Sequence, residues 1–103
     1  MSLKNKLKKN QLSIGSWIMM SDSVSVDVMA LAGFEWLVVD IEHTSIDLKA
    51  VENLIRTIQA NNIKALVRVS KNEEVVIKRV LDMGADGIVV PLVCSKEDAL
   101  RAV

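Results

Sequence analysis

Four side chains that could do chemistry follow segments with the pattern of buried strands. Asp40, Glu42 and His43 come directly after the apolar run 36–39, and Arg68 follows a second apolar run. His43 is the only histidine of the chain, and imidazole is the side chain that changes charge near neutral pH, so His43 is the candidate general acid or base. The planar guanidinium of Arg68 offers paired donors that suit a carboxylate or a phosphate.

Each of these residues also has a structural interpretation. A lone histidine is more often a surface or hydrogen-bonded residue than a catalyst, but the place of His43 directly after a buried strand favours chemistry. A charge within a buried strand is costly unless it is paired, so a salt bridge to Asp40 or Glu42 is the alternative for Arg68. The two carboxylates could orient His43, hold a metal-bound water or only pair with Arg68. Two carboxylates are too few to establish a metal site.

The segments that must position these residues alternate between two patterns. Continuous apolar stretches are typical of parallel strands buried on both faces. Stretches with apolar residues three and four apart, ended by glycine or asparagine, predict helices. The predicted strands are 12–19, 36–39, 63–69 and 87–93. The predicted helices carry their apolar residues at 24–31, 51–58 and 76–81, and a last helix opens at Ser95. Asp47 is placed to cap the second helix, which Asn61-Asn62 ends, and Glu73 and Glu74 lie in the first turn of the third. A basic helix precedes them; we expect Leu3 and Leu7 to pack against the floor of the fold and its lysines to face solvent.

Strands that alternate with helices pair in parallel through right-handed crossovers. Four strand–helix units amount to half of a (β/α)₈ barrel, whose usual length is about 250 residues. A weak internal repeat, in which 32–40 lines up with 83–91, agrees with such a barrel. We therefore predict an α/β fold in which 1–103 is a single partial domain, the first half of a (β/α)₈ barrel. A free-standing flavodoxin-like sheet is the alternative.

In a parallel barrel, functional side chains gather at the C-terminal ends of the strands. Asp40, Glu42, His43 and Arg68 are therefore expected on one rim, and Trp17 at the end of the first strand joins them. Core packing is the more common role of a tryptophan, but an aromatic residue at the rim can form the wall of a pocket.

The composition excludes several other classes of protein. The 103 residues are 50% hydrophobic and 25% charged, and 13 Lys and Arg balance 13 Asp and Glu. Zero net charge removes the electrostatic argument for a nucleic acid or an anionic membrane as partner. The longest apolar run, 88–94, is too short to span a bilayer, and no secretory signal is visible. The single Cys94 cannot form an internal disulfide, so we expect a cytoplasmic protein.

Several blocks of the sequence resemble the HpcH/HpaI aldolase family. The resemblance covers nearly the whole chain from about Ser13 onward, and its subfamily is the class II 4-hydroxy-2-oxoheptanedioate and 2-dehydro-3-deoxyglucarate aldolases. The blocks that carry it are Gly15-Ser16-Trp17, AGFEWLVVDIEH at 32–43, Val67-Arg68-Val69, IKRVLDMGA at 77–85 and GIVVPLV at 87–93.

This resemblance implies a TIM barrel that forms or cleaves a carbon–carbon bond with pyruvate as the nucleophile, together with an aldehyde, in a homo-oligomer. It also implies a divalent metal, Mg²⁺, Mn²⁺ or Co²⁺, that stabilises the enolate as a Lewis acid. The family's direct metal ligands come from later strands, so we expect them outside this chain. By motif, His43 matches the family's base, Arg68 the arginine that binds pyruvate, and Glu42, with Asp40, an acid beside the metal-bound waters.

Asp82 matches the acid that the family pairs with its histidine. It lies near the end of the predicted helix 76–81, and helices run antiparallel to their strands, so Asp82 is expected at the floor, far from the rim of its own subunit. We hypothesise that it reaches a histidine of a neighbouring subunit; a local hydrogen bond at the helix end is the alternative.

The sequence therefore predicts a metal-dependent class II aldolase, a carbon–carbon lyase that makes or cleaves 4-hydroxy-2-oxo acids. One alternative is a catalytically incomplete half-barrel, either a fragment or an assembly module. Another is a related barrel lyase that acts on acyl-CoA substrates.

Overall fold

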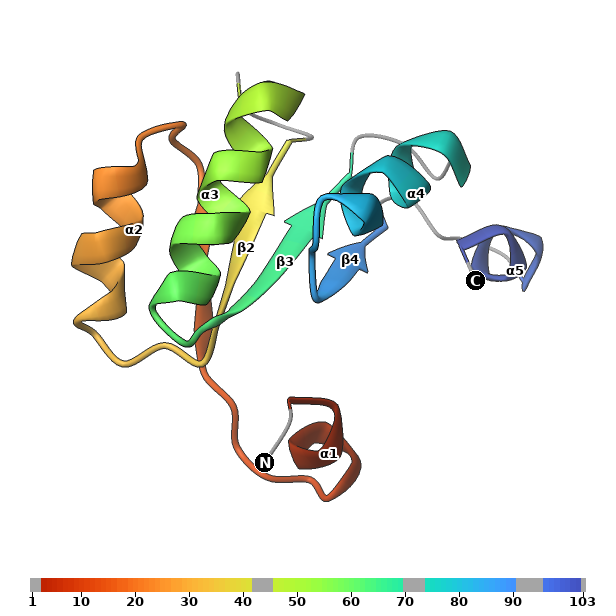
Figure 1. The fold of residues 1–103 in the computed structure, drawn as a ribbon. Helices are drawn as coiled ribbons and strands as arrows, with labels where there is room; N and C mark the ends of the chain where they lie inside the picture. The colour runs from red at the N-terminus through yellow and green to blue at the C-terminus, as the bar shows by residue number, and fades with distance from the viewer. Residues whose placement is uncertain (1–2, 42–45, 70–73, 91–95, 103) are drawn as a thin grey trace.

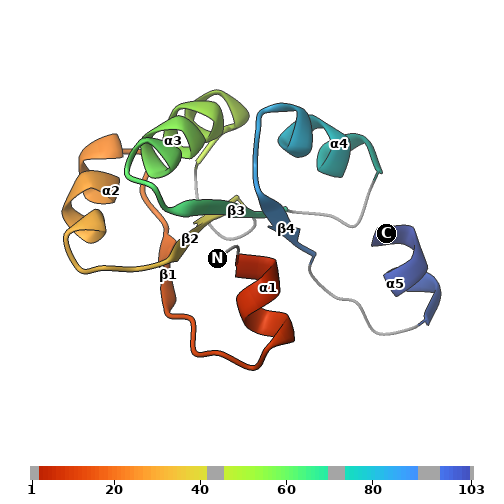
Figure 2. The same cartoon turned by 60° about the horizontal axis from the view of Figure 1, so that its bottom comes forward.

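A computed structural model describes residues 3–41, 46–69, 74–90 and 96–102. They form a parallel sheet of four strands in the order β1-β2-β3-β4, with α2, α3 and α4 in an arc on one face and α1 on the other side (Figures 1 and 2). The strands are β1 Gly15–Ile18, β2 Trp36–Asp40, β3 Lys64–Arg68 and β4 Gly87–Val89, and the helices are α1 Leu3–Lys8, α2 Ser23–Ala30, α3 Leu48–Ala60, α4 Glu74–Asp82 and α5 Lys96–Ala102.

The predicted α/β fold is confirmed, because four parallel strands alternate with helices in the expected order. The two outer strands are shorter than predicted: β1 has four residues and β4 has three. Within the described residues each of these strands pairs on one side only, so fewer ladder hydrogen bonds define its ends. Residues 91–95, which include part of the predicted fourth strand and Ser95, lie outside the described residues.

The helix-covered face of the sheet holds the hydrophobic core. Residues of β2 and β3 at alternate positions, such as Leu37 and Val67, point toward α3 and are fully buried. The apolar stripe predicted from the sequence supplies the other side of this core, with Val51, Leu54, Ile55 and Ile58 of α3 all buried. Asp47 caps the start of α3, where its Oδ1 accepts the N–H of Ala50 at 2.8 Å. The helical period of the sequence is therefore sufficient to orient α3.

The internal repeat of the sequence returns as a repeated junction between helix and strand. Gly33 after α2 and Gly84 after α4 both have positive φ, +81° and +98°, which glycine adopts without strain. Two residues later, the N–H of Glu35 donates to Ile14 O at 2.9 Å and that of Asp86 to Ala65 O at 2.8 Å. Each junction therefore ends a helix and starts the pairing of the next strand.

The opposite face of the sheet is organised in rows set by the strand register. Gly15, Trp36 and Lys64 lie in the row nearest the strand starts, and Asp40 and Arg68 lie in the row nearest their ends. The indole of Trp36 covers Gly15 so closely that a Cβ there would lie 1.9 Å from a ring carbon. Only glycine fits beneath this ring without displacing it.

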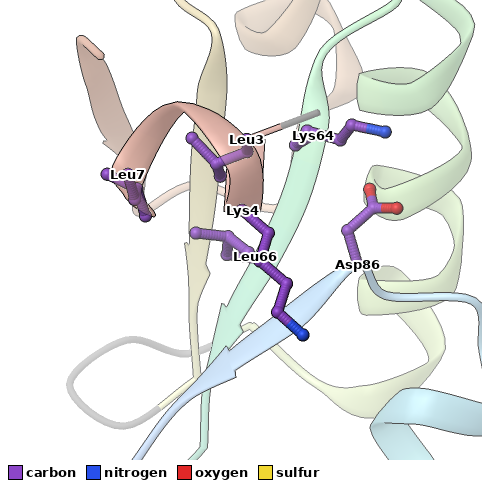
Figure 3. Close-up of a pocket in the computed structure, with 6 residues that line it drawn as sticks. All are labelled: Leu3, Lys4, Leu7, Lys64, Leu66 and Asp86. Carbon is purple, nitrogen blue, oxygen red and sulfur yellow. The ribbon is translucent and has the colours of Figure 1, made fainter. Parts of the chain in front are cut away.

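The helix α1 lies at the end of the sheet where the strands begin (Figure 1). Leu3 and Leu7 line a hollow of about 370 Å³ with Lys64 and Leu66 of β3 (Figure 3). The predicted position of the helix agrees with this, although Leu7 remains 59% exposed. The prediction that its lysines face solvent is wrong for Lys6, whose Nζ lies 2.8 Å from Glu35 Oε2. No helix within the described residues is long and apolar enough to span a membrane.

Candidate active site

The ends of β2 and β3 carry a paired carboxylate and guanidinium. Asp40 and Arg68 are direct partners in the strand register. Arg68 Nε donates to Asp40 Oδ1 at 3.1 Å and Nη2 donates to Oδ2 at 2.5 Å. The two parallel contacts form the forked geometry in which arginine recognises a carboxylate most strongly. One of the alternatives left open by the sequence, a salt bridge between these two residues, is therefore present.

The two partners differ in exposure. The side chain of Asp40 is 0% exposed, whereas that of Arg68 is 24% exposed. A carboxylate removed from water is costly unless a cation and hydrogen bonds replace the lost hydration. The backbone fixes the pair as well, because Ile41 N–H donates to Arg68 O and Val69 N–H donates to Val89 O, both at 3.1 Å. The buried Asp40 therefore holds the guanidinium of Arg68, and part of the Arg68 side chain remains accessible to solvent.

Trp17 lies against the same guanidinium. The Cζ atom of Arg68 is 4.6 Å from the centre of the Trp17 ring, within the range of a cation–π interaction. Because β1 is separated from β3 by β2, the arginine side chain reaches across one strand to meet the ring. Trp17 is 39% exposed, so core packing does not account for it. The sequence placed these three residues on one rim, but the stacking of Trp17 on Arg68 has no signal in the spacing.

Trp17 also lines an apolar hollow beside α2. The hollow measures about 250 Å³, and its other lining residues are Ile18, Met19, Met20, Ser25 and Met29. It lies at the edge of the sheet formed by β1, next to the ring that contacts Arg68. Met19 and Met20 of the β1–α2 loop are exposed. Trp17 thus contacts both the guanidinium of Arg68 and this apolar hollow.

Three predicted site residues remain. Glu42 and His43 lie outside the described residues. Asp82 is the exposed last residue of α4, which leads through Gly84 to the start of β4. Asp82 therefore lies at the opposite end of the sheet from Arg68. Its pairing with a histidine stays a prediction.

The described residues do not by themselves form a site that fits a metal. Among them, no three or more His, Cys, Asp and Glu side chains gather in a way that could hold an ion. Both carboxylate oxygens of Asp40 accept hydrogen bonds from Arg68. A divalent cation of the predicted kind would need other ligands.

A second polar cluster, which the sequence did not predict, ties α1 to the sheet. Glu35 Oε2 accepts from Ser13 Oγ at 3.1 Å and pairs with Lys6. The hydrogen bond with Lys6 lowers the pKa of Glu35 below its usual 4.5, against a smaller, opposite effect of partial burial. The internal repeat of the sequence aligns Glu35 with Asp86, and this correspondence was the signal available for the cluster. Asp86 also uses its carboxylate near a strand start, where its Oδ2 accepts from Ala65 N–H at 2.8 Å.

Residues 13–103 match the family described as HpcH/HpaI aldolase/citrate lyase. The chain belongs to this family. The resemblance predicted from the sequence is thereby confirmed, and the parallel strands and helices are those of its TIM-barrel-like fold. Arg68, Asp40 and Trp17 occupy the end of the sheet where such barrels hold their functional groups.

Three relatives illustrate the family's range. The chain is 39% identical over 100 residues to 5-keto-4-deoxy-D-glucarate aldolase of Escherichia coli. The aligned region covers 97% of this chain and 39% of that enzyme. The structure of an HpcH/HpaI aldolase from Desulfitobacterium hafniense DCB-2 superposes with a TM-score of 0.89 at 28% identity and covers 100% of this chain and 40% of that one. The structure of citrate synthase SbnG gives a TM-score of 0.89 at 35% identity, and the match covers 99% of this chain and 42% of that one. The chain thus spans about two fifths of the length of these relatives.

Proposed function

We propose that this chain is the N-terminal half of a class II aldolase barrel, a cytoplasmic carbon–carbon lyase that forms or cleaves 4-hydroxy-2-oxo acids with pyruvate as the nucleophile. The observation that carries this proposal is the guanidinium of Arg68, held by Asp40 and Trp17 at the C-terminal ends of adjacent parallel strands. Membership of a family that contains a sugar-acid aldolase supports the same reaction class.

Arg68 would bind the carboxylate of pyruvate. Arginine is charged at all physiological pH values, and its planar donors match a carboxylate better than the single point charge of lysine. The partial burial of its side chain excludes part of the competing water, which strengthens the attraction to a bound anion. The paired Asp40 holds the side chain in one place, so less conformational freedom is lost on binding.

His43 would move the proton. In the direction of cleavage it would take the proton of the 4-hydroxyl, directly or through a water, as the bond between C3 and C4 breaks and an enolate of pyruvate remains. Return of a proton to C3 then gives the methyl group of pyruvate. Glu42 would lie beside the waters of the metal. A divalent cation, Mg²⁺, Mn²⁺ or Co²⁺, would stabilise the enolate as a Lewis acid, and its direct ligands would come from outside this chain.

Asp82 would act across a subunit boundary in a homo-oligomer. Its place at the opposite end of the sheet from Arg68 keeps it away from the rim of its own subunit. A neighbouring copy could bring its own His43 to this end. The crystal structure of the assembled enzyme decides this, since an Asp82 that approaches no His43 of any subunit would exclude the pairing.

Two specific observations favour other candidates. The likeness to citrate synthase SbnG favours a barrel lyase of this family that acts on acyl-CoA substrates. The outer strands, which pair on one side only within the described residues, favour a half-barrel that is inactive until another half covers it.

The exchange of deuterium from solvent into the methyl group of pyruvate, followed by NMR with and without Mn²⁺, tests the proposal. In a complete barrel, which also supplies the ligands of the metal, we expect exchange that the His43→Ala variant abolishes. The Arg68→Lys variant keeps the charge but loses the fork, and should bind pyruvate at least about tenfold more weakly. Exchange into acetyl-CoA in place of pyruvate would favour the acyl-CoA candidate. No exchange with either compound would contradict activity of this chain and support the inactive half-barrel.

A further inference from the structure

The neighbouring helices α2 and α3 cover the same face of the sheet but differ in the side chains that they expose. Apart from the terminal Ala60, the exposed side chains of α3 are polar: Lys49, Asn53, Arg56 and Gln59. Those of α2 and its C-cap are Val24, Val28 and Leu31, with Asp27 as the one polar member. A helix that is apolar on its outward side as well as on its core side is typically buried on both sides. The outward side of α2 therefore indicates a contact that α3 does not need.

Three exposed apolar residues of α2 lie on one stripe that points away from the core. Val26 is the α2 residue that is fully buried. Each residue turns the helix by about 100°, so Val24 and Val28, two positions to either side of Val26, point to the opposite side. Leu31 keeps helical backbone angles at the C-cap and extends the row. It is 89% exposed, the highest value among the large apolar side chains that the structure describes. We call Val24, Val28 and Leu31 the α2 stripe.

The exposed apolar surface continues from the α2 stripe to the edge of the sheet. In both views α2 is the outermost helix at its end of the arc (Figures 1 and 2). Ser25 and Met29, each of which directly follows a valine of the stripe, line the hollow beside β1 together with the exposed Met19 and Met20. Five apolar side chains at these exposures form a patch of several hundred Å², a size that marks an interaction site on a soluble protein.

The charges around the α2 stripe select the kind of partner. Residues 22–31 contain two aspartates and no lysine or arginine, whereas a helix that lies on an anionic membrane carries cations beside its apolar face. Asp27 is bonded toward α3, where its Oδ1 accepts from Asn61 Nδ2 at 3.2 Å, so the stripe itself is uncharged. A second copy of the chain presents the same uncharged stripe, and a two-fold axis places identical patches against each other. Zero net charge means that two copies do not repel each other as a whole.

We propose that the α2 stripe is a contact surface between two copies of this chain related by a two-fold axis. Side chains four residues apart form a ridge that packs into the groove of a facing helix. The patch is smaller than the roughly 800 Å² per partner of a standard interface. Two copies that meet through it alone should therefore form a dimer with a dissociation constant on the order of 10–100 µM. The inference rests on the proposed function only in its homo-oligomer, to which it assigns a surface on the helix-covered side of the sheet, away from Arg68.

Sedimentation velocity of the whole chain between about 5 and 500 µM measures this association. The Val28→Glu variant places a carboxylate on both sides of the two-fold axis and should weaken the dimer at least about a hundredfold, because two like charges meet in an apolar contact. Val75→Glu is the matched control, since Val75 is a 75% exposed valine on α4; its dissociation constant should change less than about twofold. Circular dichroism verifies that both variants fold. A chain that stays monomeric at every concentration, or a dimer that Val28→Glu leaves intact, excludes the proposed surface.

Methyl NMR locates the contact without any substitution. The methyl signals of Val24, Val28 and Leu31 should shift on dilution in step with the loss of dimer, while those of Val75 stay in place. Shifts confined to residues of β1 and β4 would assign the association to the open strand edges and overturn the proposal. So would a monomer that sediments with phosphatidylserine vesicles through the stripe.

The deuterium exchange of pyruvate separates this inference from the proposed function. A dimer that Val28→Glu dissociates, in a protein that exchanges no deuterium into pyruvate, would support the α2 contact while the proposed reaction fails. Exchange by a protein that remains monomeric at every concentration would support the reaction and exclude the α2 contact.

Discussion

The face of the sheet that packs against α2, α3 and α4 is apolar and closed, whereas the opposite face carries a fixed pair of charges and an exposed tryptophan. On the first face, the buried side chains of β2, β3 and α3 need no specific partner, because burial alone stabilises them. On the second, Asp40, Arg68 and Trp17 depend on one another through defined contacts. Mutations on the two faces should therefore differ in what they disturb: packing on one, orientation and charge on the other.

The largest expected effect lies on the closed face. Ile55→Ala in α3 removes a fully buried side chain from the core and should lower the free energy of unfolding by about 2–5 kcal/mol. Urea denaturation followed by circular dichroism measures this. Arg56→Ala is the matched control, because Arg56 is exposed on the same helix and its partner Glu52 lies one turn away; a change of less than about 0.5 kcal/mol is expected there. Equal losses for the two variants would contradict the packing of α3 described here.

The next effect is an asymmetry between the two charged partners on the open face. Arg68→Ala leaves Asp40 buried without its cation, whereas Asp40→Ala leaves an arginine that already reaches solvent. We expect a loss of about 3 kcal/mol for Arg68→Ala and about half as much for Asp40→Ala, because the penalty falls on the charge that cannot regain water. Denaturation of both variants and of the double variant at pH 7 measures the coupling. If Asp40→Ala is the more damaging of the two, the pair is not anchored as its burial indicates.

The smallest effect concerns the attachment of α1. The pKa of Glu35 is lowered in the folded protein by Lys6, so the ion pair contributes stability above pH 4.5, and this contribution is lost as the pH falls through the lower pKa of the folded state. NMR signals of Leu3 and Ser13 should therefore shift toward those of a released helix in acid, while the signals of α3 stay unchanged over the same range.

The Glu35→Gln variant is the control for this titration. Glutamine keeps the size of the side chain but has no acidic proton, so the α1 signals should lose their pH dependence below pH 4.5. The same acid transition in Glu35→Gln as in the unaltered protein would assign the release of α1 to another group.

The comparison of the two faces also explains which parts of the fold were predictable. The apolar stripe of α3 and the cap at Asp47 follow from local spacing and local hydrogen bonding, so both were predicted and are confirmed. The ends of β1 and β4 were predicted too far out, because the length of a strand depends on its neighbours and not on its own apolar run. The ion pair between Lys6 and Glu35 joins residues far apart in the sequence, and no local pattern predicts such a contact.

The sequence by itself determined the order of strands and helices, the family and the end of the sheet at which Asp40 and Arg68 lie, because each of these depends on periodicity or on motif. Only the tertiary structure showed that Asp40 pairs with Arg68, since both of its carboxylate oxygens accept from the guanidinium. It also decided that the exposed ring of Trp17 lies over that guanidinium, since the two residues belong to strands that β2 separates. Contacts between side chains on different strands depend on register and on the reach of each side chain, and these are set only when the sheet has formed.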